Sequence, residues 1–301
     1  MRYLIGYNTA LDYWRKNDLV VDASSRSCRS FADPPFAGLL QLPALSDFTT
    51  PPLHLVVADE AARRRIEGIA CHLSPSELPP HSHIPIEDPF HLSTPEAAFL
   101  QAASAMDLIK LIVIGYELCG TYTELPNGNR ELAPRMTCAS LQRYLDQASG
   151  AYGIKKARKA LGYMLDRSAS PMETRLALLL SLPVLLGGYG LPQPQLNCPL
   201  AIDNATMHVD LYWHSARFAL EYDSNLHHAG AEKLNSDSIR RTRIENASAH
   251  VLSVSWDQVR DARLFDVLAH TVAARIGHRI RTTRNDSMIR RYRLRQQLFP
   301  R

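Results

Sequence analysis

The chain of 301 residues predicts an α/β protein, in which a mixed α/β half precedes a C-terminal unit with the order α-β-β-β-α-β-α. Short apolar runs bounded by turn residues alternate with amphipathic stretches, and 46% hydrophobic with 21% charged residues is the balance of a packed globular chain. The pattern of apolar runs and turn residues becomes more regular after about residue 165. We therefore expect a mixed α/β domain at 1–125, a helical connector at 126–165 and an α/β domain with a basic tail at 166–301.

The front half contains one clear strand and one clear helix start. Leu53–Val57 is a short apolar run beside prolines, which is typical of a strand. Ser93-Thr94-Pro95-Glu96 supplies a hydroxyl N-cap, a first-turn proline and a first-turn acid, so one long or two short helices should run from there to Cys119. Further helices are expected at 137–149 and 153–166.

The C-terminal domain is expected to begin with an amphipathic helix from Pro171 to Leu182. Three strands, a polar helix, a fourth strand and a last helix follow, at 196–202, 208–213, 217–222, 236–249, 250–255 and 262–276. This order describes a small sheet with helices on both faces.

Charge is unevenly distributed along the chain. The net formal charge is +4, yet residues 231–301 carry 15 Lys and Arg against 7 Asp and Glu. A basic tail of this kind fits a polyanion partner such as DNA, although a solvated basic helix gives the same count.

Several classes of protein are disfavoured. The first 18 residues lack the apolar core of a secretory signal, and the run 176–186 is too short and too broken by Pro183 to span a bilayer. We therefore expect a cytoplasmic protein with no membrane partner. The five cysteines are scattered, odd in number and without a C-x-x-C pair, which argues against a disulfide framework and a structural zinc site.

Two of the expected strands carry acids that can meet. Asp210 lies in one strand and Glu221 near the end of the next, with ten residues between them, which is enough for a tight hairpin. Side chains alternate along a strand, so Glu221 and Asp223 share a face. Converging carboxylates repel one another unless a cation neutralises them, and Mg²⁺ or Mn²⁺ is the natural occupant. This pattern favours metal-assisted hydrolysis of a phosphodiester.

These residues resemble the PD-(D/E)XK nuclease superfamily, in the branch similar to the very short patch repair endonuclease. The resemblance covers roughly residues 166–280. It rests on Asp210, Trp213, Leu220-Glu221-Tyr222-Asp223-Ser224, His227-His228, the expected helix with Asp237 and Arg240-Arg241, and 250–257. It implies a restriction-endonuclease-like core and an endonuclease that acts on DNA.

The resemblance also implies roles for single residues. Asp210 is the expected principal metal ligand, Glu221 the second and the backbone carbonyl of Tyr222 a third. Asp223 occupies the position where many relatives have a lysine that helps to activate water. That departure leaves the proton-handling or charge-stabilising role to His227, His228 or Lys233.

Glu173 resembles the acid that many relatives place beside the metal from their first helix. Ser170-Pro171-Met172-Glu173 is also a capping box, in which Ser170 and Glu173 satisfy backbone N–H groups, so both interpretations stay open. Three arginines beyond the strands are candidates to steer phosphate toward the metal, namely Arg240, Arg241 and Arg243. The arginines between 275 and 295 would extend this track.

The front half resembles the C-terminal part of AbiEi-type antitoxin or abortive-infection proteins. The resemblance rests on residues 3–15 and on the run 91–103, which contains the pattern S-x-P-E-x-x-x-L-Q-x-A. It implies a role in phage defence or mobile-element control and a protein partner for the N-terminal domain.

The sequence thus predicts a magnesium-dependent DNA endonuclease without a small-molecule cofactor. The alternative is a catalytically degenerate relative that binds nucleic acid or a toxin protein without cutting, which the missing lysine favours. A glycosidase ranks last, because the sugar-stacking aromatic residues expected beside its two carboxylates are missing.

Overall fold

The structure is a computed structural model that describes most of the chain, at residues 3–17, 51–58, 60, 63, 65, 67–74, 78–86, 89–125, 128–202, 205–223, 242–243, 250–281 and 286–299. It is an α/β protein, as the sequence predicts. Contacts divide the chain into two compact units. Unit 1 comprises Met1–Cys119 and Thr123–Met164, and unit 2 comprises Gly120–Tyr122 and Leu165–Arg301.

Unit 1 is built on a five-stranded sheet with the order β3-β2-β1-β5-β4. These strands are β1 (Tyr3–Ile5), β2 (Leu53–Val57), β3 (Ile69–Leu73), β4 (His83–Pro85) and β5 (Phe90–Ser93). The central strand β1 runs antiparallel to β2 and parallel to β5, and its apolar side chains are buried. The strand predicted at Leu53–Val57 is confirmed.

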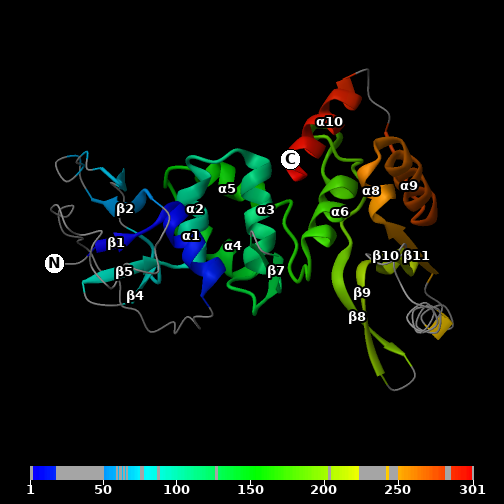
Figure 1. Cartoon of the computed structure of the whole chain (residues 1–301), viewed down its shortest axis with the longest axis horizontal. Coiled ribbons are helices and arrows are strands. Elements are labelled where there is room, and N and C mark those ends of the chain that lie inside the picture. The colour runs from blue at the N-terminus through cyan, green and yellow to red at the C-terminus, as the bar shows by residue number, and fades with distance from the viewer. Residues whose placement is uncertain are drawn as a thin grey trace. The chain divides into compact units, whose positions relative to one another are not determined.

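Two layers of helices accompany this sheet (Figure 1). Helices α1 (Tyr7–Lys16) and α2 (Pro95–Ala103) pack on the strands, and α3 (Leu108–Cys119), α4 (Cys138–Gln147) and α5 (Ile154–Leu161) pack behind α2. The stretch after Ser93 therefore forms two short helices. A hairpin of β6 (Tyr122–Leu125) and β7 (Gly128–Glu131) joins α3 to α4.

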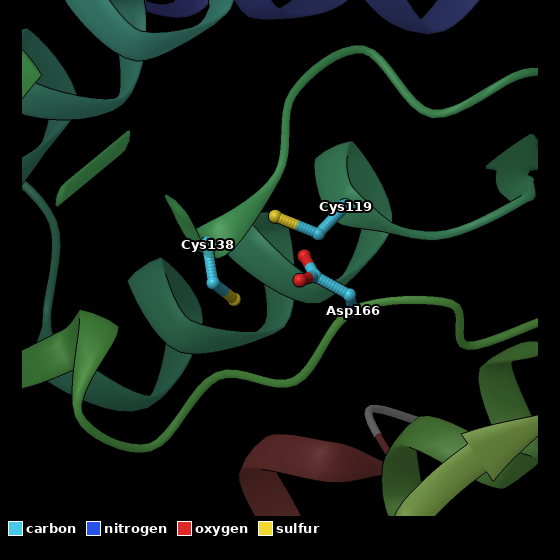
Figure 2. Close-up of side chains that lie close together, drawn as sticks. All are labelled: Cys119, Cys138 and Asp166. Atoms are coloured by element: carbon cyan, nitrogen blue, oxygen red, sulfur yellow. The ribbon is translucent and has the colours of Figure 1, made fainter. Parts of the chain in front are cut away.

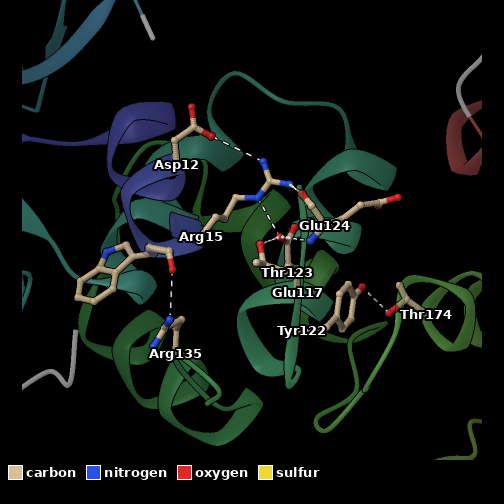
Figure 3. A network of polar contacts seen from close by, with 9 residues as sticks. Asp12, Arg15, Glu117, Tyr122, Thr123, Glu124, Arg135 and Thr174 are labelled. Carbon is tan, nitrogen blue, oxygen red and sulfur yellow. Dashed lines mark hydrogen bonds and ion pairs between the residues drawn. The ribbon is translucent and has the colours of Figure 1, made fainter. Parts of the chain in front are cut away.

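A buried acid of unit 1 is neutralised by a partner from another element (Figure 3). The Glu117 side chain is 7% exposed, and its Oε1 accepts hydrogen bonds from Arg15 Nε at 2.8 Å and from the backbone N of Glu124 at 3.1 Å. Thr123 Oγ1 donates to the same oxygen. A buried charge is tolerated when it is paired and hydrogen-bonded, so this cluster fixes α1 against α3 and β6.

Unit 2 contains a four-stranded sheet with the order β11-β10-β9-β8. The strands are β8 (Gln195–Ile202), β9 (Ala205–Trp213), β10 (Phe218–Asp223) and β11 (His250–Ser255). Strands β8, β9 and β10 form an antiparallel meander, whereas β11 runs parallel to β10. The helices are α6 (Pro171–Ser181) before the sheet and α8 (Trp256–Arg260), α9 (Ala262–Arg275) and α10 (Asp286–Leu298) after it.

The predicted first helix and four strands of this domain are confirmed, with no end displaced by more than three residues. The polar helix expected at 236–249 lies outside the described residues, apart from Thr242 and Arg243, which are helical. No helix in the described ranges is long and apolar enough to cross a membrane.

The sequence does not predict helix α10. Its buried side chains are Leu294 and Leu298 alone, so it lacks the apolar stripe from which a helix is predicted. Its arginines attach it to the rest of the unit. Arg291 Nη1 lies 2.8 Å from Asp266 Oδ1, and its guanidinium lies 3.9 Å from the ring centroid of Tyr189. This arrangement combines an ion pair with a cation–π contact.

A pair of histidines in unit 1 makes its stability depend on pH. His54 Nδ1 lies 2.7 Å from His72 Nε2, and the His72 ring stacks on Tyr7 with 3.7 Å between ring centroids. Burial, then the charges of His54 and Arg63, lower the pKa of His72 to about 4. Between pH 6.5 and pH 4 the unfolded chain therefore binds more protons than the folded one, and stability falls as the pH drops through this range.

We predict that His72→Phe, which keeps an aromatic ring on Tyr7, reduces this acid-side loss by about 1 kcal/mol, after allowance for screening of a partly exposed group. Urea unfolding from pH 7.5 to pH 4.5 measures the effect. The exposed His250, changed to Gln, is the control. An unchanged pH slope in His72→Phe would contradict the assignment.

Candidate functional site

The register of β9 and β10 brings Asp210 and Glu221 to corresponding positions. The observed pairs are Trp213 with Phe218, Tyr212 with Ala219 and Leu211 with Leu220. One step further along this register, Asp210 falls opposite Glu221. Because paired residues of an antiparallel ladder point to the same face, both carboxylates emerge on the face of Tyr212 and Ala219.

The ladder ends at this point, and a side chain replaces the backbone partner. The backbone N–H of Tyr222 donates to Asp210 Oδ2 at 2.7 Å. A backbone donor that leaves a ladder needs another acceptor, and the Asp210 carboxylate supplies one. This contact directs Asp210 at the Glu221–Tyr222 segment, and a carboxylate has enough lone pairs to accept this bond and still bind a cation.

The third acid follows on the same face. Alternation along β10 places Asp223 with Glu221, as the sequence predicts. In the parallel pairing with β11, Ser253 lies beside Glu221 and Ser255 beside Asp223. One oxygen of Glu221, Oε1, is buried, so this carboxylate reaches below the surface of the unit.

Glu173 approaches these acids from the first turn of α6. Its side chain is 6% exposed, and Oε2 accepts a hydrogen bond from the backbone N of Ala169 at 2.8 Å. Burial, followed by the charge of Asp210, raises the pKa of Glu173 to about 7, although hydrogen bonds from Ala169 and Ser170 act in the other direction. The carboxyl groups of Glu173 and Asp210 are therefore close enough to repel.

Both interpretations of Glu173 find a basis in these contacts. Ser170 Oγ accepts from the backbone N of Glu173 at 3.2 Å, as in a capping box. The reciprocal bond goes to Ala169, one residue before the N-cap Ser170. Glu173 thus caps the start of α6, and the charge of Asp210 acts on the same carboxyl group.

The acids do not form a closed cage. Among the described residues of unit 2, no three His, Cys, Asp or Glu side chains have ligand atoms that all lie within 4.8 Å of one another. Magnesium keeps several waters and needs only one or two carboxylates from the protein. Carboxylate oxygens from Asp210 and Glu221 would therefore suit magnesium better than a cation that needs all its ligands from the protein. The group offers only oxygen ligands, which are the type that hard divalent ions prefer.

The remaining residues of the predicted site are placed only in part. His227, His228, Lys233, Arg240 and Arg241 lie outside the described residues. Arg243 is exposed.

Several terminal arginines of the expected track make internal contacts. Arg290 donates to the Leu185 carbonyl, Arg291 pairs with Asp266, and Arg295 donates to the carbonyls of Val259 and Arg260. These three arginines therefore hold α10 in place rather than forming an open surface for phosphate.

Sequence reasoning missed two neighbours of the site. Arg175, two residues after Glu173, is close enough to Tyr222 for its charge to oppose the rise in the Tyr222 pKa that burial and Asp223 cause. Ser253 lies beside Glu221 only because β11 returns parallel to β10. Residues two apart on a helix do not share a face, so the spacing of Glu173 and Arg175 gives no signal. Ser253 lies in the run 250–257 that carries the resemblance, but no local pattern assigns it a place beside Glu221.

Comparison with known proteins gives two relatives, both from Mycobacterium tuberculosis. They are the uncharacterized proteins MT2308 and Rv2248, each 29% identical to this chain over 128 residues. The aligned stretch covers 42% of this chain and 45% of each relative, so it spans about half the length of those proteins. No family model matches the chain. No solved structure matches it either.

We predict that Glu173→Gln stabilises the metal-free protein at pH 8 by about 1–3 kcal/mol. Glutamine keeps an acceptor for the Ala169 N–H but carries no charge. The folded-state pKa of Glu173 is raised from 4.5 to about 7, so the folded chain binds more protons than the unfolded chain between these two pH values. The stability of the native protein therefore falls as the pH rises through this range. The gain should fade toward pH 4.5.

Urea unfolding in the presence of a chelator measures this difference, with the exposed Glu131 changed to Gln as the control. A Glu173→Gln protein that is less stable at every pH would show that the residue acts as a helix cap alone.

Proposed function

We propose that unit 2 is a magnesium-dependent DNA endonuclease of the PD-(D/E)XK type. The observation that carries the proposal is the Asp210–Tyr222 hydrogen bond at the end of the β9–β10 ladder, which directs one carboxylate at the strand that bears Glu221. The sheet order β11-β10-β9-β8, with a parallel last pair, supports it, because the acids then lie where two central strands separate.

The donor set fits a hard cation. Asp210 and Glu221 would hold it, with the Tyr222 carbonyl as a third ligand and Glu173 close by. Burial and, after it, the charge of Asp210 raise the pKa of Glu173, so a positive charge here would relieve the repulsion between the two carboxyl groups. When bound, Mg²⁺ or Mn²⁺ supplies charge stabilisation for a phosphodiester and lowers the pKa of a bound water.

The chain's own residues have separate tasks in this proposal. Asp210 keeps its orientation through the Tyr222 N–H, and Glu221 is supported by the buried strand β10. Glu173, with a pKa near neutrality in the metal-free chain, is the described carboxyl group best suited to accept a proton at physiological pH. His227, His228 and Lys233 remain candidates for the role of the missing lysine, and Arg240, Arg241 and Arg243 for phosphate contacts.

A second candidate function rests on one specific observation, the aspartate at position 223 where many superfamily members have lysine. Without the lysine side chain that helps to activate water, the unit would bind nucleic acid or a protein partner without cutting. The AbiEi-like front half belongs to the same proposal, as a domain for substrate or partner recognition in phage defence or mobile-element control.

We predict that the protein nicks supercoiled plasmid or cuts single-stranded DNA with Mg²⁺ or Mn²⁺, and that Asp210→Asn and Glu221→Gln each lower the rate at least about 100-fold. Both substitutions keep size and hydrogen-bonding capacity, and the amide oxygen that Asp210→Asn introduces can still accept the Tyr222 N–H. Asp286→Asn, at the exposed start of α10, is the matched control and should cut normally.

Gel assays with a chelator blank measure this activity. Cutting that survives both substitutions would exclude the proposed site. Binding of DNA by all forms, with no cutting by any, would instead favour the degenerate binding protein.

A further inference from the structure

Unit 1 brings together two cysteines that lie 19 positions apart in the sequence (Figure 2). Cys119 is the last residue of α3, and Cys138 is the first residue of α4. Both are thiols, and their sulfur atoms lie within 4.8 Å of one another. Cys119 is 1% exposed, whereas Cys138 is partly exposed.

The backbone beside the two cysteines fixes this proximity. The carbonyl oxygen of Leu118 accepts hydrogen bonds from the backbone N of Arg135 at 2.8 Å and of Met136 at 3.1 Å. The residue before Cys119 is thereby tied to the segment that leads into Cys138. Thr137 caps α4 and closes a capping box with Ser140, which sets the direction of its first turn. These main-chain contacts hold the segment that ends in Cys119 next to the start of α4.

We propose that Cys119 and Cys138 form a disulfide bond when the protein meets a peroxide. A disulfide needs sulfurs about 2.05 Å apart, so these two sulfurs, which lie within 4.8 Å in the reduced chain, must come closer when the bond forms. The site lies in unit 1 and does not depend on the proposed nuclease activity.

The difference in exposure sets the order of the steps. Hydrogen peroxide oxidises the accessible Cys138 thiol to sulfenic acid and is itself reduced to water. The Cys119 sulfur then attacks the Cys138 sulfur and forms the S–S bond, and the hydroxyl group leaves as a second water with the Cys119 proton. The two thiols supply two electrons, which reduce one peroxide.

The bond would close residues 120–137 into a loop that contains the β6–β7 hairpin. This loop includes Thr123 and Glu124, which hydrogen-bond Glu117, and Arg135, whose Nε donates to the Trp14 carbonyl. A crosslink at the base of the loop restricts the unfolded chain and stabilises these contacts.

The test is peptide mapping of the full-length protein after treatment with hydrogen peroxide and alkylation of the remaining thiols. We expect a crosslinked peptide that joins Cys119 to Cys138, a mass loss of two hydrogen atoms, and a melting temperature higher by about 5 °C that dithiothreitol reverses. Cys71, a partly exposed thiol on β3, gives the control variant Cys71→Ala, which should still form the crosslink.

Two further variants separate the steps. In Cys119→Ala the sulfenic acid at Cys138 should persist and react with dimedone, whereas Cys138→Ala should give neither product at these positions. If the peroxide-treated native chain contains no Cys119–Cys138 peptide, and both thiols alkylate fully or Cys138 ends as sulfinic acid, the proposal is wrong. That result comes from the native protein and does not depend on how the variants fold.

Discussion

The geometry of the candidate site in unit 2 depends on the hydrogen bond from the Tyr222 backbone to the Asp210 carboxylate. The antiparallel pairing of β9 and β10 ends before Asp210, whereas β10 pairs with β11 as far as Asp223. A backbone N–H at such a point must find another acceptor, and a carboxylate accepts more strongly than a neutral group. The same bond that lets the strands separate also holds an acid beside Glu221.

A comparison of the two buried acids shows why the site in unit 2 is unusual. Glu117 in unit 1 lies against the Arg15 guanidinium, with 2.8 Å between Arg15 Nε and Glu117 Oε1. Glu173 in unit 2 is equally buried, yet the neighbouring charge that acts on it is the carboxylate of Asp210. Two neighbouring acids add nothing to the stability of a fold, and this is the ground on which we propose a cation site there.

The sequence predicts the local parts of this account better than the long-range ones. The spacing of Asp210 and Glu221 and the alternation along β10 indicate a shared face, because a hairpin leaves few other registers. The position of β1 in the middle of its sheet and the meeting of Cys119 with Cys138 depend on contacts between distant segments, which no local pattern encodes. Helix α10 could not be predicted for another reason. It is attached by an ion pair and a cation–π contact, and it lacks the apolar face that marks a helix in a sequence.

The central claim is that Asp210 and Glu221 together bind a divalent cation. Titration of Mn²⁺ into the metal-free protein at pH 7.5, followed by electron paramagnetic resonance of the unbound ion, tests it without reference to any activity. We expect one Mn²⁺ site per chain, for which Mg²⁺ competes, and an affinity at least about tenfold weaker in Asp210→Asn and in Glu221→Gln. Equal Mn²⁺ binding by the native chain and the double variant would contradict it.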